Sequence, residues 1–181
     1  MGYALAKIAM LRGAEVMLIS GKTSLQAPNF VNLIKVNSAN EMFDAVKDNF
    51  DNQDIIIKAA AVADYRSKEI FDGKMKKKAE NLNLELERTV DILKYIGEHK
   101  KSQFVCGFSM ETNNMVENSK EKLIKKNLDM IVANNLRQKG AGFAEDTNVV
   151  TIITKDNIEE LELLSKEEVA SKIIDRIKIN L

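Results

Sequence analysis

Apolar residues along the chain form short continuous runs that alternate with longer stretches in which they recur every three or four positions. The short runs predict strands buried on both faces, and they lie at 14–20, 32–36, 54–61, 104–108 and 130–133. The stretches with helical spacing lie between them, at 3–11, 39–50 and 113–127. Buried strands separated by helices are typical of a parallel sheet covered by helices, so the pattern predicts an α/β fold.

Two signals near the C-terminus extend this pattern. Residues 147–155 alternate between apolar and polar positions, which predicts a late strand that we expect to be antiparallel. Ser165 and Glu168 have the spacing of a capping box, so a last helix should begin here and reach about Ile179. Glycine supplies only 8 of the 181 residues and proline only 1, which indicates short loops.

A polar insertion interrupts the alternation of strands and helices. Residues 66–80 are polar, and their lysines are Lys68, Lys74, Lys76, Lys77 and Lys78. Residues 82–87 then alternate leucine with asparagine or glutamate, which predicts a strand with one buried side. We interpret the two stretches together as a flap or hairpin outside the main sheet. The sequence shows no repeat, linker or low-complexity tract, so we expect residues 1–181 to form a single domain.

Composition narrows the class of protein. The 27 basic and 27 acidic residues balance, so no net charge draws the chain to nucleic acid or to an anionic membrane. A single cysteine excludes an internal disulfide and favours a reducing cytoplasm, and a single histidine argues against a His-rich metal centre. No apolar run approaches the roughly 18 residues that a membrane-spanning helix needs. We therefore expect a cytoplasmic protein that binds neither nucleic acid nor membrane.

The first candidate site follows the run at 54–61, where Val62, Ala63 and Asp64 extend a series of three alanines. Such sheets bind ligands at the carboxyl ends of their strands, and small side chains let a nucleotide approach the backbone. A carboxylate such as Asp64 is suited to Mg²⁺ or to a ligand hydroxyl. The alternative is that the alanines pack against helices and that Asp64 caps a turn.

The second candidate site is a pair of lysines. Lys122 and Lys126 are four positions apart on a predicted helix, so they share one face and could together hold a triphosphate. The alternative is an ordinary solvated face. Cys106 lies in an apolar run and is better explained as a small core residue than as a nucleophile. Neither the dinucleotide-binding nor the P-loop glycine pattern occurs, which weakens the competing hypothesis of a nicotinamide-dependent oxidoreductase.

Taken in order, short strings along nearly the whole chain resemble phosphopantothenate–cysteine ligase, the C-terminal half of the bacterial bifunctional coenzyme A biosynthesis protein. These strings are MGYALA at 1–6, RGAEV at 12–16, SG at 20–21, AAAVADYR at 59–66, KMKK at 74–77, DIL at 91–93, GF at 107–108, ET at 111–112, KNLD at 126–129, VAN at 132–134, GF at 142–143 and DTN at 146–148. The resemblance implies a Rossmann-like three-layer α/β/α fold with a mostly parallel sheet and a flap.

The resemblance also implies a reaction. CTP activates the carboxylate of 4′-phosphopantothenate as an acyl-cytidylate and releases pyrophosphate, and the amine of L-cysteine then displaces CMP. This chemistry requires Mg²⁺ and stabilised phosphate charge, but no side-chain nucleophile. The family is usually dimeric, and we expect residues 82–87 to form part of a homodimer contact. A flavin-dependent decarboxylase, fused or separate, is the expected partner.

Matched position by position, the resemblance assigns the nucleotide pocket to two strand ends. Ala60, Ala61 and Ala63 would line it with their backbone, and Phe108 would pack against the nucleotide. Asp64 would contact the nucleotide or the metal ion.

The resemblance assigns the charged groups to other segments. Lys74 would reach the nucleotide and the reacting phosphate from the flap, as the catalytic residue. Asp91 would lie beside the ribose or base; from the sequence alone it could equally be only a helix cap. Lys122 and Lys126 would hold the phosphates, with Asn127 beside them.

The chain departs from the family's pattern in two places. Before Asp91 the family usually has Lys-Asn-Pro, whereas this chain has Arg88, Thr89 and Val90. The family's Gly-Lys-Met-Gly string remains only as Met1-Gly2, without the preceding glycine-rich strand and loop or the asparagine that holds phosphopantothenate. We therefore expect the first strand to be missing, and the 181 residues alone to be marginally stable and low in ligase activity. An inactive fragment that only binds nucleotide or dimerises is the remaining alternative.

Overall fold

The computed structural model describes residues 1–69, 71–74, 82–111, 113–135 and 147–179. Its helices are α1 (Gly2–Leu11), α2 (Ala39–Asn49), α3 (Ile92–His99), α4 (Met115–Lys125) and α5 (Lys166–Ile179), with a 3₁₀ turn at Phe50–Asn52. The expected helices over 3–11, 39–50 and 113–127 are confirmed as α1, α2 and α4. For the short helix α3, the sequence predicted only the candidate cap residue, Asp91.

The main sheet has five strands in the order β10-β9-β7-β6-β3. They are β3 (Ile55–Lys58), β6 (Phe104–Glu111), β7 (Met130–Asn135), β9 (Val150–Thr154) and β10 (Ile158–Glu160). β3, β6 and β7 pair in parallel, whereas β9 runs antiparallel to β7 and β10 antiparallel to β9. The predicted α/β fold and its antiparallel late strand are therefore confirmed.

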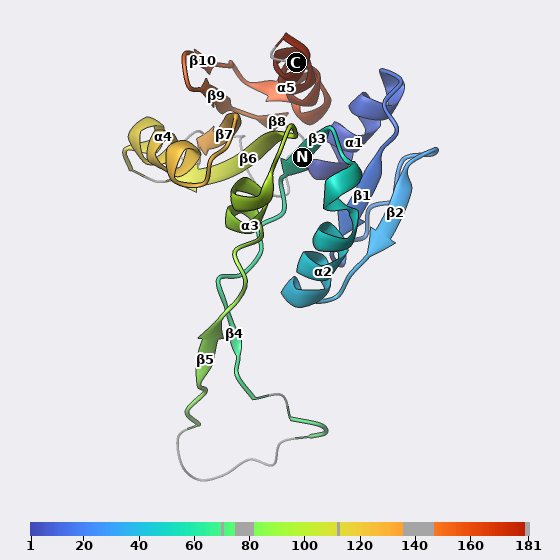
Figure 1. The fold of residues 1–181 in the computed structure, drawn as a ribbon, viewed down its shortest axis with the longest axis vertical. Coiled ribbons are helices and arrows are strands. Elements are labelled where there is room, and N and C mark those ends of the chain that lie inside the picture. The colour runs from blue at the N-terminus through green and yellow to red at the C-terminus, as the bar shows by residue number, and fades with distance from the viewer. Residues whose placement is uncertain (70, 75–81, 112, 136–146, 180–181) are drawn as a thin grey trace.

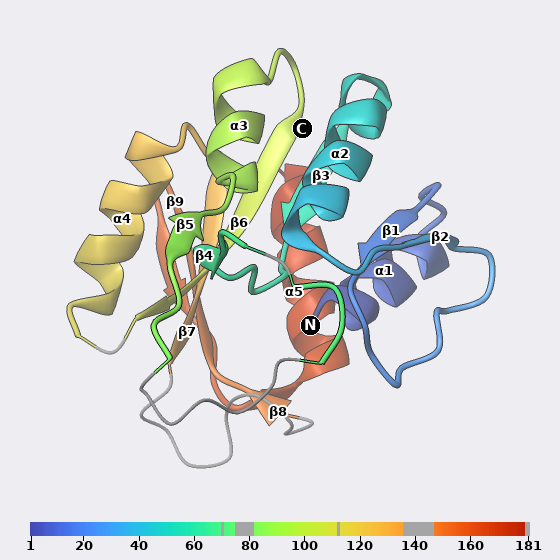
Figure 2. The same cartoon turned by 90° about the horizontal axis from the view of Figure 1, so that it is seen from below.

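Helices cover both faces of this sheet, which makes the fold three-layered (Figures 1 and 2). Phe104 and Cys106 of β6 point to one face, where they pack in the core built on α1 and α5. Val105, between them, points to the other face and packs in the core built on α3, α4 and the residues that follow α2. The alternating faces explain why the strands are apolar at every position.

A parallel pair, β1 (Met17–Ser20) and β2 (Asn32–Lys35), forms a separate sheet beside β3. Among the described residues no strand lies between β1 and β3. A cavity of ≈ 160 Å³ is lined by residues of both strands, including Leu18, Ile55 and Ile57, and by the apolar side chains of α2 and α3. The expectation of a missing interior strand agrees with this gap and stays a prediction.

The insertion forms the antiparallel hairpin of β4 (Tyr65–Ser67) and β5 (Leu86–Arg88), which extends away from the body of the molecule (Figure 1). Ion pairs join its strands, from Arg66 to Glu87 at 2.6 Å and from Lys68 to Glu85 at 2.7 Å. The expected one-side-buried strand over 82–87 is wrong in one respect. Its three leucines are exposed, because no described part of this chain covers the hairpin.

Two hydrogen bonds between neighbouring residues stabilise the start of the C-terminal helix, α5. The backbone N–H of Glu168 donates to Ser165 Oγ at 3.3 Å, and the backbone N–H of Ser165 donates to Glu168 Oε2 at 2.9 Å. These reciprocal bonds confirm the predicted capping box. Just before it, β11 (Leu164–Ser165) pairs with β8 (Thr147–Asn148). Within the described ranges, no helix combines the length and apolar character needed to cross a membrane.

Candidate functional site

A cavity of ≈ 320 Å³ opens at the carboxyl ends of β3 and β6, the edge where α/β sheets bind ligands. Four predicted residues line it: Ala60, Ala61, Phe108 and Lys122. Segments far apart in the sequence therefore meet here, as expected. Further polar groups in the lining are Lys58, Ser109, Asn134, Asn148 and Lys166.

The loop at 59–63, here called the alanine loop, begins where β3 ends. The register between β3 and β6 ends with Lys58 opposite Gly107, so the alanines lie in the loop beyond the strand rather than inside it. Two bonds then fix the end of this loop. Thr89 Oγ1 donates to the carbonyl of Ala63, and the Thr89 backbone N–H donates to the carbonyl of Asp64 at 3.0 Å. Thr89, one of the residues that depart from the family's pattern, thus connects the loop to the segment before α3.

Asp64 is exposed and does not line the cavity, but its carboxylate lies near enough to raise the pKa of Lys58. Within the described ranges its carboxylate has no hydrogen-bond or ion-pair partner, so the reading of Asp64 as a turn cap finds no support. No group of three or more His, Cys, Asp or Glu side chains suited to a metal lies in that part of the chain. One free carboxylate still fits Mg²⁺, which commonly takes one or two carboxylates and fills its shell with phosphate oxygens and water.

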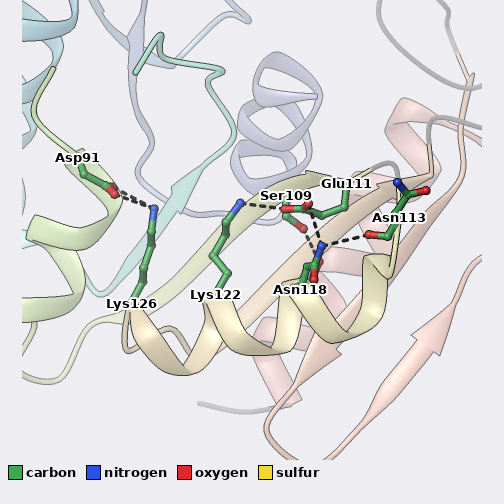
Figure 3. A network of polar contacts seen from close by, with 8 residues as sticks. Asp91, Ser109, Glu111, Asn113, Asn118, Lys122 and Lys126 are labelled. Carbon is green, nitrogen blue, oxygen red and sulfur yellow. Dashed lines mark hydrogen bonds and ion pairs between the residues drawn. The ribbon is translucent and has the colours of Figure 1, made fainter. Parts of the chain in front are cut away.

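Lys122 of α4 and Lys126, which directly follows the helix, point to the same side, as their spacing predicted (Figure 3). Lys126 Nζ lies 2.8 Å from Asp91 Oδ2, and Lys122 Nζ lies 3.3 Å from Glu111 Oε1. Their side chains are only 20% and 33% exposed, respectively. Both ammonium groups are therefore partly enclosed and held by carboxylates, and their binding of phosphates stays a prediction.

Asp91 serves two structural purposes. Its side chain caps α3 by accepting from the backbone N–H of Lys94 at 3.0 Å, and it also pairs with Lys126. Partial burial acts to raise the pKa of Asp91, but the hydrogen bonds from Lys126 and Lys94 and the positive charge of Lys126 outweigh it. The net pKa lies below its ordinary value, so the carboxylate is negative at neutral pH.

Glu111 joins the site because β6 is longer than the predicted strand. The run at 104–108 predicted a strand that ended at Phe108, whereas β6 continues to Glu111. This extension brings the Glu111 carboxylate to Lys122 and to the Asn118 amide, which donates to it at 3.3 Å (Figure 3). Beneath it, the buried hydroxyls of Ser109 and Ser119 lie 2.7 Å apart and join β6 to α4.

Asn127 does not line the cavity. Its backbone has a φ of 48°, a left-handed conformation that ends α4, and its side-chain amide donates to the carbonyl of Gly97 at 2.9 Å. The residue therefore fixes the turn that carries Lys126 against α3. The structure gives Asn127 a positioning role, and contact with a nucleotide stays a prediction.

Lys74 also lies outside the cavity lining. It belongs to the described segment 71–74 beyond β4, in the insertion whose hairpin extends away from the body of the molecule (Figure 1). The other lysines of the flap string lie outside the described residues. The catalytic role expected for Lys74 stays a prediction, and within one chain this arrangement does not bring it to the cavity.

Known proteins share this arrangement. Residues 1–180 match the family model of the DNA/pantothenate metabolism flavoprotein C-terminal domain. The coenzyme A biosynthesis bifunctional protein CoaBC of Bacillus subtilis is 50% identical over 179 residues, which cover 98% of this chain and 44% of that protein. The chain spans about half the length of the curated relatives it matches.

Solved structures agree with the sequence comparison. The crystal structure of a CoaBC C-terminal domain has a TM-score of 0.84 at 44% identity and covers 98% of this chain and 80% of its own. A Cab2 mutant in complex with phosphopantothenate-cysteine has a TM-score of 0.76, covering 97% of this chain and 76% of its own, but its 14% identity shows the fold alone. With a family model matched almost from end to end, a half-identical relative and a shared fold, this chain belongs to the family of DNA/pantothenate metabolism flavoprotein C-terminal domains.

Proposed function

We propose that residues 1–181 form the phosphopantothenate–cysteine ligase part of a coenzyme A biosynthesis protein. The observation that carries this proposal is the convergence of the alanine loop, Phe108 and Lys122 on one cavity, in a chain half identical to CoaBC. The name of the Cab2 complex adds support, because a protein of this fold binds phosphopantothenate-cysteine. The reaction would join the carboxylate of 4′-phosphopantothenate to the amine of L-cysteine.

The proposed reaction has two steps. A carboxylate oxygen of 4′-phosphopantothenate attacks the α-phosphorus of CTP, which forms an acyl-cytidylate and releases the β- and γ-phosphates as pyrophosphate. The cysteine amine then attacks the acyl carbon, loses a proton, and displaces CMP together with the bonding electron pair. No protein nucleophile is needed, which suits a site whose nearest thiol, Cys106, is fully buried in β6.

The protein's own contribution is binding and charge. Ala60 and Ala61 leave their backbone open to a closely packed base or ribose, and Phe108 offers an apolar surface beside them. Lys122 would exchange its contact with Glu111 for a phosphate oxygen, because both groups compete for the same ammonium. Asp64 would hold Mg²⁺, which supplies positive charge for the phosphate chain when bound.

Nucleotide choice and assembly belong to the same proposal. We take CTP rather than ATP as the nucleotide on the strength of the family resemblance. We further propose a homodimer in which exposed leucines of the hairpin contact a second copy, since Leu82, Leu84 and Leu86 are 64%, 58% and 57% exposed. A flavin-dependent decarboxylase would supply the other activity of the bifunctional relatives, in the cytoplasm.

The test is a chimera of the Bacillus subtilis relative in which residues 1–181 replace the matching 44% of that protein. We expect the chimera to form phosphopantothenoylcysteine and pyrophosphate from CTP, 4′-phosphopantothenate and cysteine, detected by mass spectrometry. ATP in place of CTP, and Lys122→Met in the chimera, should each lower the rate. A chimera that keeps the relative's decarboxylase activity but makes no ligation product would contradict the proposal, because the retained activity shows that the chimera folds.

A further inference from the structure

Lys58 is a cation of the candidate cavity that no described carboxylate contacts within ion-pair distance. It is the last residue of β3 and lines the cavity together with Lys122. Lys122 and Lys126 each have a carboxylate partner, whereas Lys58 has neither a hydrogen-bond nor an ion-pair partner among the described residues. The ammonium group is thus partly withdrawn from water without an anion in contact.

The alternation along β3 explains how a lysine comes to lie there. Ile55 and Ile57 pack on the face of α1 and α5, whereas Ile56 packs on the face of α3 and α4. Lys58 continues the row of Ile56 and therefore projects beside the cap of α3 and the lysine face of α4. An apolar residue would complete the run at this position, so the charge is not required by the sheet.

The surrounding charges do not neutralise this ammonium group. Burial is the largest influence and lowers the pKa of Lys58, and the positive charge of Lys126 lowers it further. The carboxylates of Asp91 and Asp64 act in the opposite direction, and Lys122 adds a smaller lowering. Because Asp91 is already engaged by Lys126, the net effect leaves the pKa of Lys58 below its ordinary value, and a bound anion would stabilise the charged form.

We propose that Lys58 binds a phosphate group of the nucleotide and is a third cation of the nucleotide site, beside Lys122 and Lys126. This inference rests on the proposed ligase function and adds a residue to its site. The phosphate monoester of 4′-phosphopantothenate has the same chemistry. The nucleotide is favoured because Lys58 lines the same cavity as the alanine loop and Phe108, the groups suited to a base.

The experiment compares ligand binding by calorimetry in four versions of the 181-residue chain: wild type, Lys58→Met, Lys58→Arg and the control Lys120→Met. Methionine keeps an apolar stem in place, so the fold should persist, which thermal unfolding checks. Lys120 is an exposed lysine of α4 outside the cavity and matches the loss of charge. The probes are CTP, uncharged cytidine and 4′-phosphopantothenate, each titrated alone.

We expect Lys58→Met to weaken CTP binding about 10- to 100-fold while cytidine binding stays within about twofold. Lys58→Arg should retain most of the affinity, and Lys120→Met should match wild type. Unchanged CTP binding by a folded Lys58→Met variant overturns the inference and leaves the ligase proposal standing. A loss confined to 4′-phosphopantothenate also overturns it, and so does a folded wild-type chain that does not bind CTP; the chimera tests the proposed function separately.

Discussion

At the scale of single residues, the charged groups around the cavity are held in pairs that link separate elements. Lys126 joins α4 to the cap of α3 through Asp91, and Lys122 joins α4 to the end of β6 through Glu111. These contacts keep the cations close to one another despite their repulsion. Each pair therefore links two elements in the absence of ligand, and in the proposed function its cation would be available to a phosphate.

Asp91→Asn tests the first pair, because asparagine can still cap α3 but carries no charge opposite Lys126. The folded state lowers the pKa of Asp91, so its contribution to stability is present above the unfolded value and is lost as the pH falls through the folded one. We expect the free energy of unfolding, measured with urea, to fall more steeply for wild type than for the variant below about pH 5. Parallel curves for the two proteins would show that the pair contributes nothing.

A substitution at Gly97 tests how closely α3 approaches the end of α4. A Cβ added at this glycine would lie 1.8 Å from the carbonyl oxygen of Lys126, so one of the two backbone segments would have to shift. We expect Gly97→Ala to lower the free energy of unfolding by about 1–3 kcal/mol. The control is Gly21→Ala, because a Cβ there meets nothing within 4 Å. Equal stabilities for the two variants would contradict this close packing.

The sequence could predict the shared face of Lys122 and Lys126 because helical spacing is a local property. It could not predict their partners, since Glu111 and Asp91 lie 11 and 35 positions away from them along the chain. The partial enclosure of Lys58 could not be predicted for a similar reason. A lysine after three isoleucines looks like the solvated end of a strand, and only the neighbouring helices show that it is partly enclosed.

At the scale of elements, the hairpin of β4 and β5 has few stabilising contacts within the described part of the chain. Its ion pairs are exposed, and such pairs contribute little to stability. Its leucines and Tyr65 remain open to solvent. A surface of this kind indicates a contact with another chain, and a second copy is the occupant we propose.

We expect Leu84→Glu to shift the chain from dimer to monomer, because it places a charge in the proposed contact. Sedimentation velocity measures the two species directly. Leu25→Glu is the matched control, since Leu25 is 61% exposed against 58% for Leu84 but lies in the loop between β1 and β2. A wild-type chain that is monomeric at all concentrations would contradict the proposed dimer.

Helices and strands could be predicted where the residues that specify them are close together in the sequence. The capping box of α5 formed as expected, because Ser165 and Glu168 need only each other. The alternation in 82–87 indicated extended structure but not what covers the apolar side, and only Leu86 of the three leucines lies within β5. A pattern of alternation specifies which side is apolar, whereas the covering partner is a property of the assembled protein.

At the scale of the whole molecule, the sequence pattern was sufficient for the fold class because both faces of each parallel strand must be covered. It was not sufficient to show that the parallel strands divide into two sheets. That division depends on which edges meet, and the apolar cavity between β1 and β3 becomes evident only when the strands are placed side by side.

Cys106 offers a probe of the whole fold. It is fully buried in β6, and burial raises the pKa of its thiol well above the ordinary value. We expect a thiol reagent at pH 8 to label the native chain only as fast as global unfolding exposes this residue. Adding urea should accelerate labelling in parallel with the loss of helical circular dichroism. Rapid labelling of the native chain would show that the central strand is accessible and would contradict the packing described.

The central claim is that the carboxyl ends of β3 and β6 form a nucleotide site, and a crystal structure of the chain with bound CTP tests it most directly. We predict the base or ribose against the alanine loop and Phe108, with a phosphate oxygen within about 4 Å of the ammonium of Lys122. A nucleotide bound elsewhere, for example in a separate cavity lined by Lys22 and Lys35, would contradict the claim.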